Sequence, residues 1–406
     1  MCTIISLLSC LLSGSNSYIP TYKKNFLKFW WNEELDQLKE ASITSNRLWK
    51  AAGKPRQGPV FNKRQSCRAQ YRRRIRECQA MTTESYTNDL HEALLTKDNT
   101  TFWKCWRSKF ESANKCVQVE GCVDPGIIVE KFNEHFSKAY SCNNVHRAES
   151  LKDEYTKLRE DYCGFPLLDD IDFDTEMVSS VILALKRGKA ADIAGLSAEH
   201  LQYCHPMLSV ILSKFFRLIL LSRYIPNGFK HSYIVPIPKI KDCRTKAMTC
   251  NDFRGIAISP ILSKVFEHCL LKHLQLFLAS NDNQFGFKKG LGCSHAIYTV
   301  RNIVNRFVAE GNTVNLCAID LSKAFDKVNH HALYIKLMKR HIPAQYLSII
   351  ENLFSNCYTC IKWNNCWSAD FVINFGVRQG SVLSPFLFAM YIDGIGDLCR
   401  PECNYI

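Results

Sequence analysis

Apolar residues recur at helical spacing through most of the first 110 residues. This pattern predicts a helix that is capped by Asn32 and stops at Gly53, then a proline- and glycine-containing linker over 54–59. A second helix is expected to follow, with Tyr71, Ile75 and Cys78 on one stripe. A third is expected to carry aromatic side chains on one face: Phe102, Trp103, Trp106 and Phe110. The amino-terminal region is therefore predicted to be all-helical.

Helices and strands mix from about residue 161 onward. Asp174 caps a predicted helix that ends at Gly188, and alternating apolar positions predict strands near 233–237 and 256–258. Further helices are expected after Ser259-Pro260, over 297–307, and over about 330–340 and 343–354; a strand is expected over 313–320, a hairpin near 364–365 and a last helix after Pro385. Because the elements do not alternate as regular βαβ units, the fold class predicted is α+β, with domains over 1–160 and 161–406.

Positive charge is concentrated in one stretch of the helical region. Between Arg47 and Arg76 there are eleven basic residues and no acid, so 14 − 11 leaves a net charge of only +3 for the rest of the chain. Aromatic residues lie within the same stretch, which favours nucleic-acid contact over the alternative of a solvated helix surface. The candidate phosphate-binding residues are Arg64, Arg68, Arg72, Arg73, Arg74 and Arg76.

The 20 cysteines are scattered, in a chain too long for a small secreted disulfide scaffold. The apolar start, residues 1–12, is shorter than a membrane span and has no basic residue before it, so a buried helix is favoured over a signal peptide. We therefore expect an intracellular protein, in the nucleus or cytoplasm, without a membrane partner. A zinc site is not expected at Cys357 and Cys360 with Cys366, Cys399 and Cys403, since an odd separation on a strand points side chains to opposite faces.

Asp320 is the strongest candidate for chemistry. An apolar run, 313–319, leads directly into this carboxylate, which a strand would deliver to the edge of a sheet. A hard ion such as Mg²⁺ prefers carboxylate oxygens and waters, and also binds substrate phosphates. Taken alone, an aspartate after a strand is more often a helix N-cap.

Several ordered motifs resemble the reverse transcriptases of non-LTR (LINE-type) retrotransposons. They are GLSAEHLQYC (195–204), YIVPIPK (233–239), NDFRGIAISPILSKVFE (251–267), QFGFKKGLGCSHAI (284–297), CAIDLSKAFDKVNH (317–330) and GVRQGSVLSPFLFAMYID (376–393). FWWNEEL (29–35) resembles the segment on the carboxyl side of the endonuclease in these elements. The resemblance implies a helical basic amino-terminal region of this post-endonuclease type, then partial fingers and palm of a right-hand polymerase.

The resemblance also implies roles for individual residues. Asp320, helped by the Leu321 carbonyl, would bind the catalytic Mg²⁺ ions, with Mn²⁺ possible. Phe325 would lie under the incoming sugar and select deoxynucleotides, although it could also be an ordinary core aromatic. The partners implied are an RNA template, a DNA primer and deoxynucleoside triphosphates, in the two-metal scheme of nucleotidyl transfer.

The same resemblance assigns the rest of the nucleotide pocket. Arg254 and Lys239 would hold the triphosphate, and Gln379 and Gly380 would line the pocket, the glycine letting backbone approach the nucleotide. The alternatives are a surface charge for Arg254 and a simple turn for Gln379 and Gly380.

The family's Tyr-x-Asp-Asp hairpin is not matched by Tyr391-Ile392-Asp393-Gly394, and the hairpin, thumb and endonuclease are expected to be missing from these 406 residues. A polypeptide of these residues is therefore predicted to lack polymerase activity on its own. The alternatives are a non-catalytic nucleic-acid-binding fragment and an intron-encoded or telomerase-type relative.

Overall fold

The structure, a computed structural model, describes residues 32–97, 118–166, 173–239 and 247–398, together with Ser13 and Phe102. Contacts divide these residues between two compact units, Asn16–Lys115 and the unit that contains Cys116–Ile406. No helix in the described part of the chain is both long enough and apolar enough to cross a membrane.

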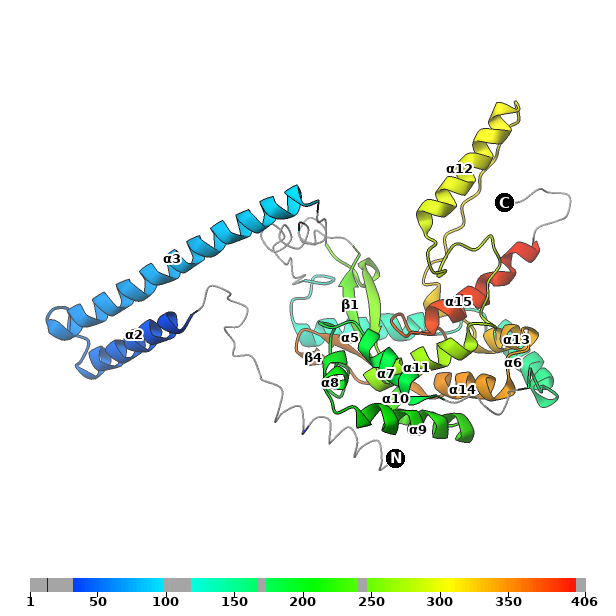
Figure 1. The fold of residues 1–406 in the computed structure, drawn as a ribbon, viewed down its shortest axis with the longest axis horizontal. Coiled ribbons are helices and arrows are strands. Elements are labelled where there is room, and N and C mark those ends of the chain that lie inside the picture. The colour runs from blue at the N-terminus through cyan, green and yellow to red at the C-terminus, as the bar shows by residue number, and fades with distance from the viewer. Residues whose placement is uncertain are drawn as a thin grey trace. The chain divides into compact units, whose positions relative to one another are not determined.

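The first unit is built on a helical hairpin, α2 (Glu33–Ala51) and α3 (Pro59–Leu95), whose two helices run side by side in Figure 1. Asn32 caps α2 as predicted, because its side-chain oxygen accepts a hydrogen bond from the Leu35 N–H at 3.0 Å. The chain leaves the helix at Gly53, whose φ is +76°. The predicted aromatic third helix lies outside the described residues, apart from Phe102.

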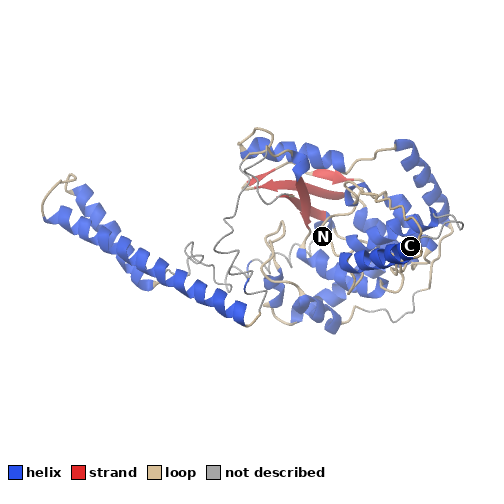
Figure 2. Cartoon of the chain, turned by 90° about the horizontal axis from the view of Figure 1, so that it is seen from above, coloured by secondary structure: helices blue, strands red, loops and turns tan. Residues whose placement is uncertain are grey.

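The second unit contains one mixed sheet, drawn red in Figure 2. Its strands are β1 (His231–Pro238), β2 (Phe253–Ile258), β3 (Cys357–Trp363), β4 (Cys366–Trp367) and β5 (Phe371–Ile373). The order is β2-β1-β3-β4, and β5 also pairs with β3. β1 is antiparallel to β2 and parallel to β3, while β4 and β5 are antiparallel to β3. Strands joined in this mixed way among helices confirm the predicted α+β class.

Helix α5 (Pro125–Ala139) covers one face of the sheet. Phe132 lies at its centre, with ring centroids 4.9 Å from Phe253 and 5.2 Å from Trp363. Since side chains alternate along a strand, the opposite face carries Tyr233 of β1 and Arg254 of β2. One face of the sheet is thus buried in a small core, and the other carries Arg254, a candidate nucleotide-binding residue.

A larger core lies among the helices that flank the sheet. They are α7 (Thr175–Ala184), α8 (Ala198–Gln202), α9 (Met207–Ser222), α10 (Asn227–Lys230), α11 (Ile261–Leu274), α13 (His330–Lys339), α14 (Ala344–Phe354) and α15 (Ser384–Ile392). Asp174 caps α7 as predicted, by accepting from the Met177 N–H. The helices predicted after Pro260 and Pro343 form as α11 and α14.

Helix α6 (Val145–Glu160) packs on α13, and Arg159 near its end forms an ion pair with Glu351 of α14 at 2.9 Å. Together with α5 it therefore belongs to the sheet-bearing unit. Contacts divide the chain near residue 115, whereas the sequence predicted a boundary at 160. The difference arises because the apolar side of α5 packs on the sheet, which lies much later in the chain.

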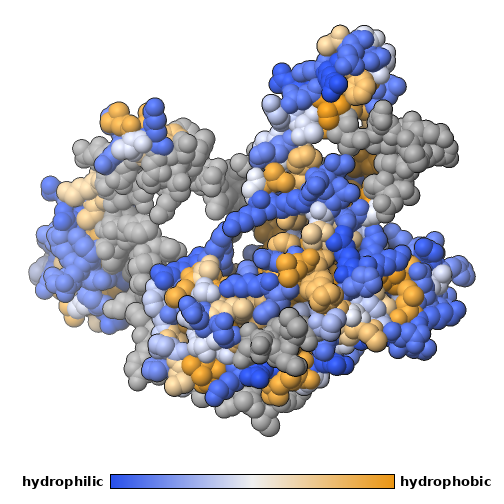
Figure 3. Space-filling model, turned by 45° about the vertical axis from the view of Figure 1, so that its right-hand side comes forward, coloured by the Kyte–Doolittle hydropathy of each residue, from blue (hydrophilic) through white to orange (hydrophobic). Residues whose placement is uncertain are grey.

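The strand predicted over 313–320 is wrong. These residues have no regular structure, and the side chains of Leu316 and Ile319 are 72% and 82% exposed. A strand needs a neighbour to satisfy its backbone groups, and in the described part of the chain none pairs with this segment. The preceding helix α12 (Cys293–Ala309) forms as predicted, but none of its residues is buried. Its apolar side chains are therefore exposed beside polar ones on the surface (Figure 3).

Candidate functional site

Two motif segments far apart in the chain are joined by backbone hydrogen bonds. The Val377 N–H donates to the Phe325 carbonyl and the Gly376 N–H to the Val328 carbonyl, both at 2.8 Å. The Gln379 side chain reaches Asp326 Oδ1 at 3.4 Å, a weak contact. The Phe325–Val328 turn and the Gly376–Gln379 segment therefore form one unit.

A third motif, on β2, meets the same place. The Ala257 N–H donates to the Gln379 carbonyl at 2.7 Å. Gly380 follows with φ of +131°, and a Cβ at this position would lie 2.2 Å from the Ala257 carbonyl oxygen. The glycine is thus required for a close approach to the β2 backbone.

Asp326, which sequence reasoning passed over, is the buried acid of this turn. Burial raises the pKa of its carboxyl group, while the contacts with Gln379, Lys323 and the Tyr140 hydroxyl oppose that rise. Burial, and then the charge of Asp326, raise the pKa of the Tyr140 hydroxyl. The signal available in the sequence was the second acid of DLSKAFD, which lies one residue after Phe325.

Glu267 of α11 is a second residue that the sequence reasoning missed. It is fully buried, and its carboxylate accepts hydrogen bonds from the Val382 N–H at 2.8 Å, the Leu383 N–H at 3.1 Å and the hydroxyl groups of Ser263 and Ser381. It therefore holds residues 381–383, which connect Gly380 to the start of α15. An acid amid the buried apolar positions of α11 was the signal.

Asp320 and Leu321 lie in the irregular segment before this turn, and both are exposed. In the described ranges, no three ligand atoms of His, Cys, Asp or Glu side chains gather around Asp320. These residues by themselves therefore do not fit a pair of divalent ions, which needs several carboxylates.

Phe325 is half-buried in an aromatic group. Its ring stacks on Phe388 of α15 with centroids 4.6 Å apart, and Phe287 meets it edge-on at 5.9 Å. The ring is thus held in place by its contact with α15.

Arg254 and Lys239 lie at the end of the β1–β2 hairpin where the loop joins the two strands, and both are exposed. Arg254 pairs in register with Ile237. The Lys239 ammonium donates to the Asn251 carbonyl at 2.7 Å, so it is partly engaged by the hairpin itself.

The six candidate arginines of α3 fall into two groups. Arg64 lies over the Trp49 ring at 3.7 Å, Arg73 pairs with Glu77, and Arg74 pairs with both Glu34 of α2 and Glu77, at 2.7 and 3.2 Å. The exposed ones that remain are Arg68, Arg72 and Arg76. The structure therefore brings part of the predicted basic surface into contacts that hold the hairpin together.

His330, at the start of α13, supports the same motif junction and predicts a pH dependence. It is buried, its Nε2 lies 2.7 Å from the Gly376 carbonyl, and burial lowers its pKa to about 4. An unfolded histidine binds a proton near pH 6.5, so between pH 6.5 and 4 the unfolded state takes up the proton and the folded state does not. Stability should therefore fall as the pH falls through this window.

The measurement is urea unfolding at pH 7 and pH 5, for the wild type and for His330→Gln, which can still donate to the carbonyl. We expect acidification to cost the wild type on the order of 2 kcal/mol more than the variant. Equal losses in the two proteins would contradict this assignment.

Comparison with known proteins defines the class. Residues 237–406 match the family described as reverse transcriptase (RNA-dependent DNA polymerase), which includes β2, the Phe325–Val328 turn and the Gly376–Gly380 segment. This part of the chain is therefore similar to reverse transcriptases.

The relatives narrow the class further. The chain is 22% identical over 337 residues to the probable RNA-directed DNA polymerase from transposon BS of Drosophila melanogaster, covering 79% of this chain and 36% of that protein. It is 25% identical over 240 residues to the probable RNA-directed DNA polymerase from transposon X-element of the same fly, covering 57% of this chain and 25% of that protein. It is 24% identical over 220 residues to the RNA-directed DNA polymerase from mobile element jockey of Drosophila funebris, covering 53% of this chain and 24% of that protein.

The chain is thus related to the reverse transcriptases of non-LTR retrotransposons, as its motifs suggested. It spans about a third or less of the length of these relatives.

Proposed function

We propose that this chain contributes the nucleotide- and template-binding parts of an RNA-templated DNA polymerase that works by nucleotidyl transfer. The observation that carries the proposal is the junction of three family motifs, in which the Gly376–Gln379 segment bonds both to the Phe325–Val328 turn and to β2. A pocket for a nucleotide needs rigid walls from several segments, and backbone hydrogen bonds supply that rigidity.

Within this proposal the residues have distinct tasks. Arg254 binds the triphosphate, because its guanidinium fork pairs with two phosphate oxygens. Phe325, which is only partly buried, contacts the sugar, and Gln379 and Gly380 lie beneath the template or base. Asp320 and the Leu321 carbonyl supply one side chain and one backbone oxygen, which is too few for a pair of divalent ions, so no step of this proposal depends on Mg²⁺. The partners proposed are the RNA template, the DNA primer and deoxynucleoside triphosphates.

The test is nucleotide binding by the chain itself, measured as fluorescence anisotropy of a labelled deoxynucleoside triphosphate. Arg254→Ala should weaken binding about 10-fold or more, since a charge-assisted hydrogen bond contributes about 1.5–3 kcal/mol. The matched control is Lys214→Ala, which removes the same charge from an exposed position on α9. Equal affinities in the two variants would refute the role of Arg254.

A second function, nucleic-acid binding without catalysis, is favoured by the exposed arginines of α3. Replacing Arg68, Arg72 and Arg76 with alanine should weaken binding to single-stranded RNA. It should also reduce the slope of log affinity against log salt concentration by about 2, because each lost phosphate contact removes about 0.7.

The control for this variant removes three positive charges elsewhere, at the exposed residues Lys152, Lys157 and Lys214. Its slope should stay near that of the wild type. The same loss of slope in both variants would mean that binding follows overall charge, and that the α3 surface has no special part in it.

A further inference from the structure

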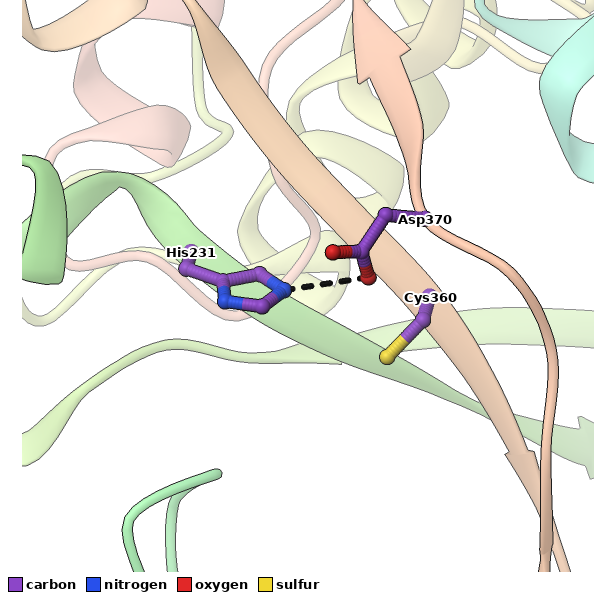
Figure 4. A group of neighbouring side chains, drawn as sticks. All are labelled: His231, Cys360 and Asp370. Atoms are coloured by element: carbon purple, nitrogen blue, oxygen red, sulfur yellow. Dashed lines mark hydrogen bonds and ion pairs between the residues drawn. The ribbon is translucent and has the colours of Figure 1, made fainter.

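Three potential metal ligands converge on the sheet, and one of them is Cys360, for which the cysteine spacing predicted no zinc site. His231 begins β1, Cys360 lies in the middle of β3, and Asp370 immediately precedes β5 (Figure 4). The imidazole nitrogen, the thiol sulfur and a carboxylate oxygen all lie within 4.8 Å of one another. His231 Nε2 is 3.1 Å from Asp370 Oδ1. In the described part of the chain, this is the one group of three such ligands.

The sheet itself holds the three side chains together. In the parallel β1–β3 pair, Tyr233 lies opposite Cys360, so His231 is two residues away on the same face. In the antiparallel β3–β5 pair, Phe371 lies opposite Thr359, which brings the preceding Asp370 beside Cys360. The strand register therefore positions all three ligands before any ion arrives, which reduces the entropy lost on binding.

Burial gives the group an inner and an outer side. Cys360 is only 4% exposed, whereas the side chains of His231 and Asp370 are 34% and 49% exposed. An ion can therefore approach from solvent and keep a water molecule on its open side. The other cysteine of the Cys-x-x-Cys pair, Cys357, points away and donates its thiol to the Leu353 carbonyl.

The donor set selects the kind of ion. One thiolate, one imidazole and one carboxylate suit a borderline-soft ion such as Zn²⁺, whereas Mg²⁺ and Ca²⁺ prefer oxygen ligands throughout. Tetrahedral zinc with bonds of about 2.0–2.3 Å needs ligand atoms roughly 3.3–3.7 Å apart, so small side-chain movements suffice. We propose that His231, Cys360 and Asp370 bind a zinc-type divalent ion whose fourth position is open to water, and that the ion links β1, β3 and the segment before β5.

Binding would displace the thiol proton to solvent, leaving the thiolate on the metal. No residue of the nucleotide pocket takes part. The site is therefore independent of the proposed function and can be tested without polymerase activity.

The test uses the full chain, stripped with a chelator under reducing conditions and titrated with Co²⁺ as a spectroscopic substitute for Zn²⁺. The wild type should show a thiolate-to-cobalt charge-transfer band and a rise in Tm on addition of Zn²⁺. Cys360→Ser should abolish the band that this site contributes. His231→Gln and Asp370→Asn, both at partly exposed positions, should weaken binding at least about 100-fold, beyond the loss of a merely supporting group.

Because the chain has 20 cysteines, the control is Cys366→Ser on neighbouring β4, which should leave the band and the Tm rise unchanged. If the four variants and the wild type bind Co²⁺ alike, or if the wild type does not bind it, the trio is a hydrogen-bonded group and the proposal fails. Should Cys360→Ser not fold, the His231 and Asp370 variants decide the question by themselves.

Discussion

Replacing Glu267 with alanine is expected to lower the free energy of unfolding of the sheet-bearing unit by about 3–5 kcal/mol. The fully buried carboxylate accepts from the N–H groups of Val382 and Leu383 and from two serine hydroxyls. Without it, these donors remain buried and unpaired at the start of α15, and each unpaired donor costs about 1–3 kcal/mol. The measurement is urea denaturation followed by circular dichroism.

Two further variants separate this role from a general effect of charge. Glu267→Gln keeps the shape and one acceptor oxygen, so it should lose about half as much stability as alanine. Glu149→Ala removes an exposed acid from α6 and should change stability by less than about 0.5 kcal/mol. A Glu267→Ala protein as stable as the Glu149→Ala protein would show that the buried hydrogen bonds are replaced by others.

Replacing Gly380 with alanine should lower the free energy of unfolding by a comparable amount and should also weaken the proposed nucleotide binding. The added Cβ would lie 2.2 Å from the Ala257 carbonyl oxygen, at a φ of +131° that side chains other than glycine rarely adopt. Because the neighbour is backbone of β2, the segment must move away. We expect a loss of at least about 3 kcal/mol and a weaker affinity for a labelled deoxynucleoside triphosphate.

The matched control is Gly286→Ala, since a Cβ there meets nothing within 4 Å. That variant should unfold at nearly the same urea concentration as the wild type. If Gly380→Ala retains both wild-type stability and nucleotide affinity, the close approach of Gly380 to β2 is not needed for the pocket.

Local signals in the sequence predicted most of the elements. Asn32 and Asp174 accept hydrogen bonds from N–H groups three residues later, so each cap is decided within one helical turn. Apolar residues at every second position over 233–237 and 256–258 likewise predicted β1 and β2, because such a pattern gives each strand an apolar side that can be read from a few residues. The ordered motifs identified the family for the same reason: they can be read along the chain.

The candidate site was predicted less completely. The motif junction contains Phe325, Gln379 and Gly380, which the sequence had singled out, and their roles stay predictions. Asp326 and Glu267 were missed because their importance comes from burial, which depends on segments 53 and more than 100 residues away. The strand expected over 313–320 failed for a related reason, since its apolar pattern has no strand beside it in the described residues.

The amino-acid sequence by itself determined the helix caps, the alternation of the first two strands and the kinship with non-LTR reverse transcriptases. Only the tertiary structure decided which charges pair within the fold, as when Arg74 pairs with Glu34 forty residues earlier. It also decided that His231 and Asp370 meet Cys360 across parallel and antiparallel strand pairs. The physical reason is that caps and periodicity act within a few residues, whereas strand register and burial depend on partners far along the chain.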